Sequence, residues 1–465
     1  MTDSSMATMH VALLPSSGMG HLTPFLRLAA RLDACGYTVT FISILPTVSS
    51  SESSHQSRFF STYPRIRCME FHLLPFDPST ASSTDPFLLQ FEAIRRSLHL
   101  LPPLLTSTLP SISALIIDIS LTSSIVDVVA NLPFSTYILF TSSASMLAFC
   151  AYFPIAAQSN TSNENSHLQV PGVPHIQNLH IPPPLLQPTN LFKTQFIENG
   201  LALVKTDGIL LNTFDALEPD TLVEINKGAV VPALPPVVAV GPLEPCDFNF
   251  ANEEELTFSW LNAKPAGSVV YVSFGSRTAL SGDQIKQLAV GLKMCECRFL
   301  WVVKSTKVDK EDRVQLGELV GDEFLESVRE RGLVVNGWVE QCGVLGHPAV
   351  GGFVSHCGWN SLTEAAWHGV PVLAWPQGGD QRINAGVVEK SGFGIWERKW
   401  DWCGDQAQLV MGSEIAKRVH ELMSDQGIRA QATRIREEAR RAVAVGGSSA
   451  NSLVKVMEAL KSRAT

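Results

Sequence analysis

The chain has 465 residues, of which 45% are hydrophobic and 17% charged, and its formal net charge is −9. This composition is typical of a globular protein with two or three domains and excludes a disordered or a membrane protein. An acidic chain without a long basic run is a poor partner for nucleic acid or an anionic membrane surface. The nine cysteines show no C-x-x-C or zinc spacing, and residues 1–9 lack the Lys or Arg of a secretory signal. We therefore expect free thiols in a cytoplasmic protein.

The first half of the chain alternates short apolar runs with helical patterns. A strand predicted at residues 10–14 leads through the loop 15–21 into a helix, in which apolar residues recur at Leu22, Phe25, Leu26, Ala29 and Leu32. A strand at residues 38–44 completes a β-α-β unit, and further strands are predicted at 114–117, 135–140 and 208–212. The uncharged stretch 134–157 is interrupted by Thr141-Ser142-Ser143, which indicates a buried strand and a core helix rather than a membrane span. Residues 46–57, 77–84 and 159–169, rich in Ser, Pro and other polar residues, are predicted surface loops.

The composition changes at residues 240–255, where Gly-Pro, a further Pro and three consecutive Glu residues mark a linker. Beyond it the alternation starts again. Strands are predicted at residues 269–274, 299–303, 333–336, 352–355 and 372–375, and helices at 284–294, 322–331 and 360–368. The sequence therefore predicts an α/β protein with two doubly wound parallel sheets in series, at residues 1–245 and 246–445, and a final helix within 446–465. Ligands of such sheets bind beyond the carboxyl ends of the strands.

Residues 338–381 hold the densest set of residues suited to a nucleotide, reading W-V-E-Q, then H-P, F-V-S-H-C-G-W-N-S-L-T-E, G-V-P and W-P-Q-G-G-D-Q. Residues 353–356 are predicted to end a buried strand, and residues 360–368 to form the next helix. The loop His356-Cys357-Gly358-Trp359 then brings backbone N–H groups and a helix N-terminus to one point, which favours a diphosphate. Gly358 permits close approach of the backbone, and Glu364 can accept hydrogen bonds from two vicinal hydroxyls.

This run resembles the signature box of the plant family-one, UDP-sugar-dependent glycosyltransferases. The fixed positions of that box are occupied at the expected spacing by Trp338, Gln341, His347, His356, Gly358, Trp359, Asn360, Ser361, Glu364, Pro371, Asp380 and Gln381. The resemblance implies the GT-B architecture, in which two Rossmann-like domains face a cleft and the last helix packs back on the first domain. It also implies a UDP-sugar as co-substrate, with no other cofactor and no metal. We expect a monomer.

The residue roles of that family carry over to the matching positions. The phosphates are expected to contact His356, Asn360 and Ser361. The uracil is expected to stack on Trp338, and the ribose to be held by Gln341 and Glu364. The sugar hydroxyls are expected to bind Asp380 and Gln381. A Gln at this last position accompanies glucose in the family, so UDP-glucose is the expected donor. The remainder of the expected donor site is Ser276, Val339, Gly358, Trp359 and Thr141.

His21 is the candidate general base. It lies where the loop after the first strand becomes a helix, and a helix N-terminus favours the neutral, proton-accepting imidazole. Transfer to a phenol needs such a base, because a phenol is barely ionised at neutral pH. The family's base matches His21, and the Asp that orients it matches Asp118, at the carboxyl end of a predicted neighbouring strand.

The first domain resembles a narrower group, the plant flavonoid C-glycosyltransferases. Three short motifs carry this resemblance: Asp85-Pro86-Phe87, the order Asp118-Ile119, and Trp375-Pro376-Gln377. A His is more common at the position of Gly378. The resemblance implies an inverting transfer of glucose to a ring carbon of a 2-hydroxyflavanone, dihydrochalcone or flavone, giving a β-C-glucoside. The expected acceptor site comprises Asp85, Phe87, Ile94, Ile119, Leu147, Phe192 and Phe196.

Other functions fit the sequence less well. A Rossmann dehydrogenase would need a third glycine at Thr23 and an acidic residue near Ile44, and neither is present. The chain contains no G-x-S-x-G motif of a serine hydrolase. A UDP-sugar-binding module without activity is disfavoured by the presence of both His21 and Asp118. A flavonoid O-glucosyltransferase on the same scaffold stays open as the alternative, and the acid stability of the product distinguishes the two.

Overall fold

The computed structural model describes residues 9–81, 85–158, 168–174, 176, 180–188, 190–246, 255–304, 314–337, 339–400 and 408–464. The chain divides into two compact units. Unit 1 consists of Met1–Leu179, Pro183–Phe248 and Ala442–Thr465, and unit 2 of His180–Pro182 and Asn249–Arg441. No helix in the described part of the chain combines the length and apolar character that a membrane span requires.

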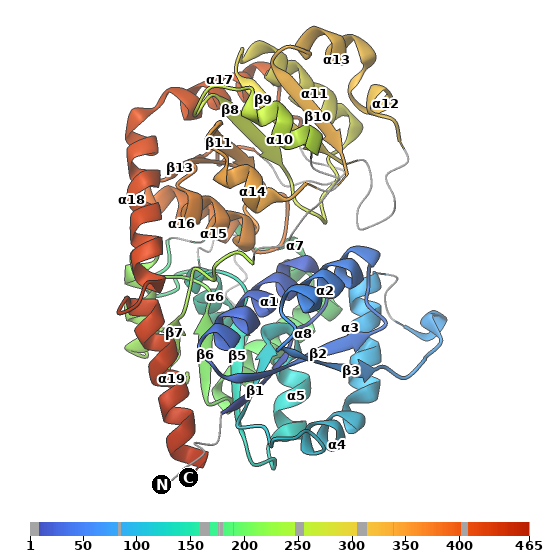
Figure 1. The fold of residues 1–465 in the computed structure, drawn as a ribbon, viewed down its shortest axis with the longest axis vertical. Coiled ribbons are helices and arrows are strands. Elements are labelled where there is room, and N and C mark those ends of the chain that lie inside the picture. Colours follow the sequence, from blue (N-terminus) through green and yellow to red (C-terminus); the bar gives the residue numbers. More distant parts are fainter. Residues whose placement is uncertain are drawn as a thin grey trace. The chain divides into compact units, whose positions relative to one another are not determined.

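A parallel sheet of seven strands forms the centre of unit 1, in the order β3-β2-β1-β4-β5-β6-β7 (Figure 1). Its strands are β1 (His10–Leu14), β2 (Thr38–Leu45), β3 (Arg67–His72), β4 (Ala114–Asp118), β5 (Ser135–Phe140), β6 (Gly208–Leu211) and β7 (Val237–Ala239). The strands β1, β4 and β6 are buried along their whole length, as apolar strands covered on both faces must be. The strand order reverses between β1 and β4. The segments that follow these two strands therefore meet at the carboxyl edge of the sheet.

The helices of unit 1 are α1 (Met19–Ala34), α2 (Ser50–Thr62), α3 (Pro86–Ser97), α4 (Leu101–Thr106), α5 (Thr122–Val129), α6 (Ala144–Gln158), α7 (Pro183–Leu186), α8 (Leu191–Ala202), α9 (Pro219–Asn226) and α19 (Ser448–Ala464). The last of these shares a core with the first. Leu453, Met457 and Leu460 of α19 lie in one buried cluster with Phe25 of α1 and residues of β1. The hydroxyl of Ser449 also donates to the carbonyl of Gly241 at 2.6 Å. The end of the chain therefore completes the core of unit 1.

The prediction of a loop at residues 46–57 is wrong, because residues 50–62 form α2. The side chain of Ser49 caps this helix by accepting a hydrogen bond from the backbone of Glu52. Phe59, near the other end of the helix, is fully buried and packs on Phe41 with ring centroids 6.4 Å apart. A cap and one buried aromatic residue thus fix a helix whose Ser-rich composition is typical of a loop. The predicted loop at 159–169 lies mostly outside the described residues.

Unit 2 is built around a parallel sheet of six strands in the order β10-β9-β8-β11-β12-β13. Its strands are β8 (Val269–Ser273), β9 (Arg298–Val303), β10 (Gly332–Asn336), β11 (Val350–Ser355), β12 (Val372–Ala374) and β13 (Gly394–Trp396). The order reverses between β8 and β11, whose last residues, Ser273 and Ser355, are register partners. Loops that leave these two strands therefore lie side by side.

The helices of unit 2 are α10 (Glu255–Asn262), α11 (Gly282–Met294), α12 (Leu316–Val320), α13 (Asp322–Val328), α14 (Gln341–Gly346), α15 (Trp359–His368), α16 (Gln381–Ser391), α17 (Gly412–Ser424) and α18 (Gln426–Val443). Its core includes Trp375 and Trp400, whose ring centroids are 4.5 Å apart. The prediction of an α/β protein with two Rossmann-like domains is confirmed.

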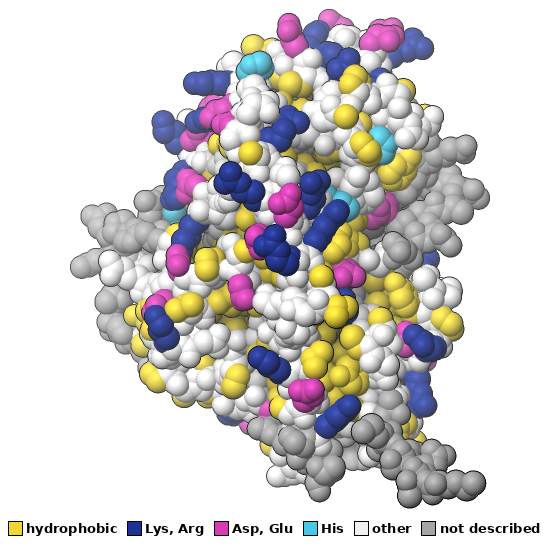
Figure 2. Space-filling view, turned by 60° about the vertical axis from the view of Figure 1, so that its left-hand side comes forward, with side chains coloured by type: hydrophobic (Ala, Val, Ile, Leu, Met, Phe, Trp, Pro, Cys, Tyr) yellow, Lys and Arg dark blue, Asp and Glu magenta, His cyan; other side chains and the backbone are white. Residues whose placement is uncertain are grey.

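Charged side chains of both signs are scattered over the face shown in Figure 2. There, Lys and Arg side chains are interspersed with Asp and Glu side chains. Such an interspersed pattern offers no continuous basic surface to a polyanion on that face.

Candidate active site

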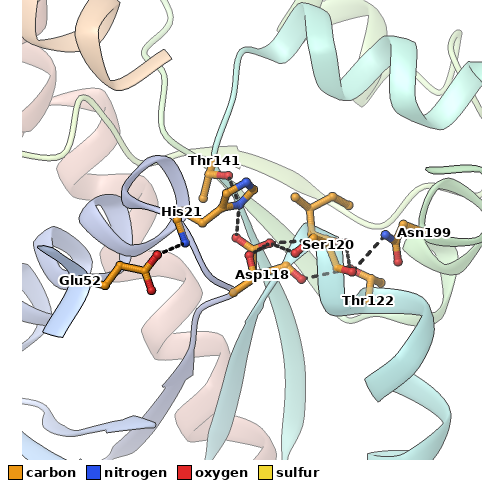
Figure 3. A network of polar contacts seen from close by, with 10 residues as sticks. His21, Glu52, Asp118, Ser120, Thr122, Thr141 and Asn199 are labelled. Atoms are coloured by element: carbon orange, nitrogen blue, oxygen red, sulfur yellow. Dashed lines mark hydrogen bonds and ion pairs between the residues drawn. The ribbon is translucent and has the colours of Figure 1, made fainter. Parts of the chain in front are cut away.

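A histidine and an aspartate meet at the carboxyl edge of the unit 1 sheet (Figure 3). His21 lies in the first turn of α1, directly after β1, and Asp118 is the last residue of β4. Because β1 and β4 are neighbours, the two side chains come together, and His21 Nδ1 lies 2.8 Å from Asp118 Oδ2. The imidazole is 34% exposed, whereas Asp118 is fully buried. The pair therefore presents one ring to a substrate and hides the carboxylate behind it.

The surroundings of Asp118 keep its carboxyl group ionised. Its Oδ1 accepts hydrogen bonds from Ser120 N at 2.8 Å, Ser120 Oγ at 2.6 Å and Ser16 Oγ at 3.0 Å. Burial alone would raise the pKa of Asp118, but the charge of His21 and the hydrogen bonds from His21 and Ser120 outweigh burial, so that the pKa is lowered. A carboxylate at Asp118 accepts the Nδ1–H of His21. The lone pair of the imidazole then resides on Nε2, as a general base requires.

Three further contacts hold the loop that carries His21. Glu52, from α2, is only 4% exposed and accepts a hydrogen bond from Gly18 N at 2.7 Å. Ser17 Oγ donates to Gln90 of α3. The ring of Phe87, also on α3, packs on Gly18 so closely that an added Cβ there would lie 3.1 Å from Phe87 Cε1. The helix that begins with Asp85-Pro86-Phe87 therefore supports the loop of His21 directly.

Thr141 also belongs to this site. It follows β5, and its Oγ1 lies 3.2 Å from His21 Nδ1. The turn after Asp118, residues 119–121, is held from α8, because Asn199 Nδ2 donates to the carbonyl of Ser120 at 3.2 Å. Ile119 is therefore fixed next to the carboxylate of Asp118. Four residues of this site were not expected from the sequence: Ser16, Glu52, Ser120 and Asn199. Only Ser120 had a local signal, as a serine two residues after an Asp at a strand end.

The loop between β11 and α15 in unit 2 has the geometry predicted for a diphosphate site. The N-cap of α15 is Gly358, which offers no capping side chain, and Cys357 adopts a left-handed φ of 68°, a strained conformation of the kind that accumulates at functional sites. His356 is packed between two glycines, because an added Cβ at Gly275 or at Gly358 would lie 2.5 Å from its Nε2. The helix N-terminus and the loop thus present backbone to a ligand.

His356 is neutral in this site. Burial lowers its pKa to about 4, against a smaller opposing effect of the Ser273 backbone. A neutral imidazole can bind a phosphate oxygen as a hydrogen-bond donor but contributes no full positive charge. The loop after β8, which carries Gly275 and Ser276, lies against this ring. The macrodipole of α15 is then a source of positive potential that this loop offers to a diphosphate.

The residues expected at the ribose are in contact with one another. Gln341 Nε2, at the start of α14, donates to Glu364 Oε2 at 2.7 Å and to Ser361 Oγ at 2.9 Å. Glu364 and Ser361 lie on α15 and are each 6% exposed. Val339, two residues before Gln341, is buried. Trp338 lies outside the described residues.

The residues expected at the sugar lie at the start of α16. Asp380 is the N-cap of this helix, and its Oδ2 accepts a hydrogen bond from Asn384 Nδ2 at 2.8 Å. Gln381 Oε1 accepts from the backbone of Gln377 at 2.7 Å and of Gly378 at 2.9 Å. Gln381 therefore shapes the loop with its oxygen and can offer a sugar only its amide N–H groups. An added Cβ at Gly378 would meet nothing within 4 Å. Gly378 therefore leaves open space at the position where a His is more common in the group that the first domain resembles.

The expected acceptor residues do not form one described pocket. Asp85 caps α3 by accepting from Phe87 N at 2.9 Å, and Phe87 lies beside the loop of His21. Phe192 and Phe196 belong to an aromatic group on α6 and α8, with centroids 6.1 Å apart. Ile94 and Leu147 are buried, at 2% and 0% exposure. Among the described residues, no group of three or more His, Cys, Asp or Glu side chains could hold a metal ion.

A diphosphate loop in one Rossmann-like unit and a His–Asp pair in the other are features of the nucleotide-sugar glycosyltransferases. Residues 231–398 match the family model described as UDP-glucoronosyl and UDP-glucosyl transferase. UDP-glycosyltransferase 708G2 of Citrus unshiu is 52% identical, over 97% of this chain and 96% of that protein. UDP-glycosyltransferase CGT of Oryza sativa subsp. japonica is 49% identical, over 96% of this chain and 95% of that protein. The crystal structure of LpCGTa in complex with UDP matches with a TM-score of 0.86 and 50% identity, covering 98% of this chain and 99% of that chain.

The chain therefore belongs to the UDP-glycosyltransferase family. It is an enzyme of the plant family-one group, close to members named as C-glycosyltransferases, and a UDP-sugar is its donor.

Proposed function

We propose that this enzyme transfers glucose from UDP-glucose to a ring carbon of a flavonoid-type polyphenol and forms a β-C-glucoside. The observation that carries the proposal is the contact of 2.8 Å between His21 and the buried Asp118. The loop that leads to His21 is supported by Phe87 of the motif Asp85-Pro86-Phe87. The CGT names of similar proteins agree with it. The acceptor is a 2-hydroxyflavanone, dihydrochalcone or flavone with hydroxyls that flank the reacting carbon.

The first step is removal of a phenolic proton. His21 Nε2 takes the proton of a hydroxyl next to the reacting carbon, and the Asp118 carboxylate, which accepts from Nδ1 at 2.8 Å, stabilises the imidazolium that forms. The phenolate shares its negative charge between the oxygen and the ortho ring carbons. Both kinds of atom become nucleophiles, so deprotonation alone does not decide which bond forms.

The second step is displacement of UDP. The ring carbon attacks the anomeric carbon, the bond from that carbon to the diphosphate oxygen breaks, and UDP leaves with the bonding electrons. The ring carbon then loses its hydrogen as a proton to solvent, which restores the aromatic ring as a phenolate, and the phenolate oxygen takes back the proton held by His21. The dipole of α15 and the neutral His356 stabilise the diphosphate charge that develops. A single displacement from an α-linked donor inverts the anomeric centre, so the product is β.

The orientation of the ring selects carbon over oxygen. A shift of about 1 Å in the attacking atom changes rates by about 100-fold, because near-attack geometry dominates such reactions. Phe87 lies beside the loop of His21, and Ile119 follows Asp118 in a turn held by Asn199. We assign to these two side chains the apolar surfaces that orient the acceptor.

The linkage of the product tests the proposal. The purified enzyme is incubated with UDP-glucose and phloretin, and the product is heated in acid. A C-glucoside survives this treatment, whereas a matched O-glucoside, treated in parallel as the control, is cleaved to phloretin. An acid-labile product overturns the proposal in favour of the flavonoid O-glucosyltransferase alternative.

A further inference from the structure

Glu218 is a buried acidic residue that the mechanism above does not use. It is 4% exposed, and burial raises the pKa of its carboxyl group against the opposing effect of its hydrogen bonds. Keeping an acidic group in such a place costs free energy. Glu218 is also the N-cap residue of α9, yet its side chain makes no capping hydrogen bond to that helix. Its hydrogen bonds are directed elsewhere.

The carboxyl group of Glu218 caps α6 instead. Oε2 accepts a hydrogen bond from Ala144 N and Oε1 accepts one from Ser145 N, each at 2.9 Å. The other amides of the first turn bind Ser143, because Met146 N donates to its Oγ at 3.1 Å and Leu147 N to its carbonyl at 3.0 Å. Glu218 thus satisfies two amides at the start of α6 that the helix itself cannot bind.

The same carboxyl group connects two strands of the sheet. Its Oε2 also accepts from Thr213 Oγ1 at 2.9 Å, and Thr213 follows β6, which pairs with β5. The loop after β5 carries Thr141, three residues before Ala144, and Thr141 Oγ1 lies 3.2 Å from His21 Nδ1. A line of polar contacts therefore runs along the carboxyl edge, from the end of β6 through Glu218 and the β5–α6 loop to the catalytic imidazole.

We propose that Glu218 is a positioning residue for the transfer step, which fixes the β5–α6 loop so that Thr141 stays in contact with His21. The inference rests on the proposed role of His21 as the base. Glu218 is buried and acts on His21 only through this loop.

The test is a double-mutant cycle with Glu218→Gln and Thr141→Val. Each oxygen of Glu218 accepts two hydrogen bonds, since Ser145 Oγ also donates to Oε1 at 3.0 Å. An amide NH2 in place of either oxygen therefore faces a backbone N–H that can only donate, from Ala144 or Ser145, and displaces the loop. We expect Glu218→Gln to lower kcat by roughly 10- to 100-fold, as a misplacement of about 1 Å does. In the Thr141→Val background it should lower kcat by less than about threefold, because the contact through which it acts is already lost.

Controls separate positioning from stability. Asp207→Asn removes a carboxylate that accepts from Thr136 N at 2.8 Å, at the other end of β5, and it should lower the melting temperature while kcat stays unchanged. Thr213→Val removes one bond to Glu218 and is the milder variant if Glu218→Gln does not fold. It should lower kcat in the same non-additive way with Thr141→Val.

Two results would overturn the inference: a Glu218→Gln enzyme with the kcat of the wild type, or losses that multiply in the double variant. The rate is measured as release of UDP, which counts C- and O-transfer alike, so an acid-labile product overturns the proposed linkage and leaves the cycle intact. The inference also depends on the proposed role of His21 as the general base. A His21→Ala enzyme assayed in parallel tests that role, because full turnover by this variant would refute it.

Discussion

The substitution Asp118→Asn tests the catalytic pair through the tautomer of His21. The new side chain keeps the shape of the old one but has one oxygen and one NH2 group. Three donors converge on Oδ1, and Ser120 N, at 2.8 Å, is a backbone amide that can only donate. The amide oxygen must therefore occupy the position of Oδ1. The NH2 group then occupies the position of Oδ2, which lies 2.8 Å from His21 Nδ1.

This arrangement reverses the hydrogen bond between the two residues. The NH2 group donates to Nδ1, so the ring proton moves to Nε2, and an Nε2–H cannot accept the proton of a phenol. Loss of a general base costs about 10²- to 10⁴-fold in kcat, which corresponds to about 2.7–5.4 kcal/mol in the activation barrier. His21→Ala should cost a similar factor, and the double variant should be no slower than either single variant, because the two residues act as a unit.

The assay is release of UDP from UDP-glucose with saturating phloretin. Calorimetric binding of UDP serves as the control and should be unchanged, because Asp118 belongs to unit 1 and the diphosphate loop to unit 2. Ser120→Ala removes one of the three donors to Oδ1 and keeps the backbone N–H, so we expect it to retain most of the wild-type kcat. An Asp118→Asn enzyme with more than about a tenth of the wild-type kcat would refute the tautomer argument.

Three further outcomes are expected. Gly275→Ala should raise the dissociation constant for UDP by about tenfold or more, or about 1.4 kcal/mol, because the added Cβ would lie 2.5 Å from His356 Nε2 at a φ of +76°; wild-type affinity by calorimetry would contradict this. The wild type should prefer UDP-glucose to UDP-galactose. Asp380→Ala should remove several kcal/mol of that selectivity, because a site built around hydroxyl hydrogen bonds discriminates strongly. Equal wild-type rates with the two donors in competition would count against this prediction. Burial lowers the pKa of His55 and of His356 to about 4, so the unfolded chain binds these protons at higher pH than the folded chain. The melting temperature should therefore fall as the pH is lowered from about 6.5 towards 4, and a constant value over this range would be inconsistent with the burial of these rings.

The sequence was informative where apolar runs are continuous and uninformative where structure depends on distant contacts. Strands such as β1 and β11 are buried throughout, so their residue types alone reveal them. The edge strand β3 has a largely exposed pattern, and β7 and β13 have three residues each, too few to show a period. The helix α2 was missed although Ser49 and Glu52 have the spacing of a capping box, because the Ser-rich composition favoured a loop and no local pattern displays the burial of Phe59.

The same distinction holds for the site. Asp118 and His21 could be brought together from sequence because neighbouring parallel strands end at one edge, and the contact of 2.8 Å follows from that topology. The supporting residues could not be predicted, because Glu52 and Gln90 approach the loop from helices whose placement depends on packing. Gln381 shows a further limit. The family resemblance implied a sugar ligand at Gln381, but the structure reveals that its oxygen also fixes the loop at residues 377–378.

The position of α19 in the core of unit 1 affects the order in which the two units can fold during synthesis. Leu453, Met457 and Leu460 are needed to cover the cluster that contains Phe25 and β1, but a ribosome delivers them only after residues 249–441 of unit 2. At roughly 5–20 residues per second, the nascent first sheet waits on the order of 10–40 s with part of its apolar surface uncovered. During synthesis the second unit can therefore finish folding before the first, and shortening the chain at its C-terminus would damage the core of the unit that carries His21.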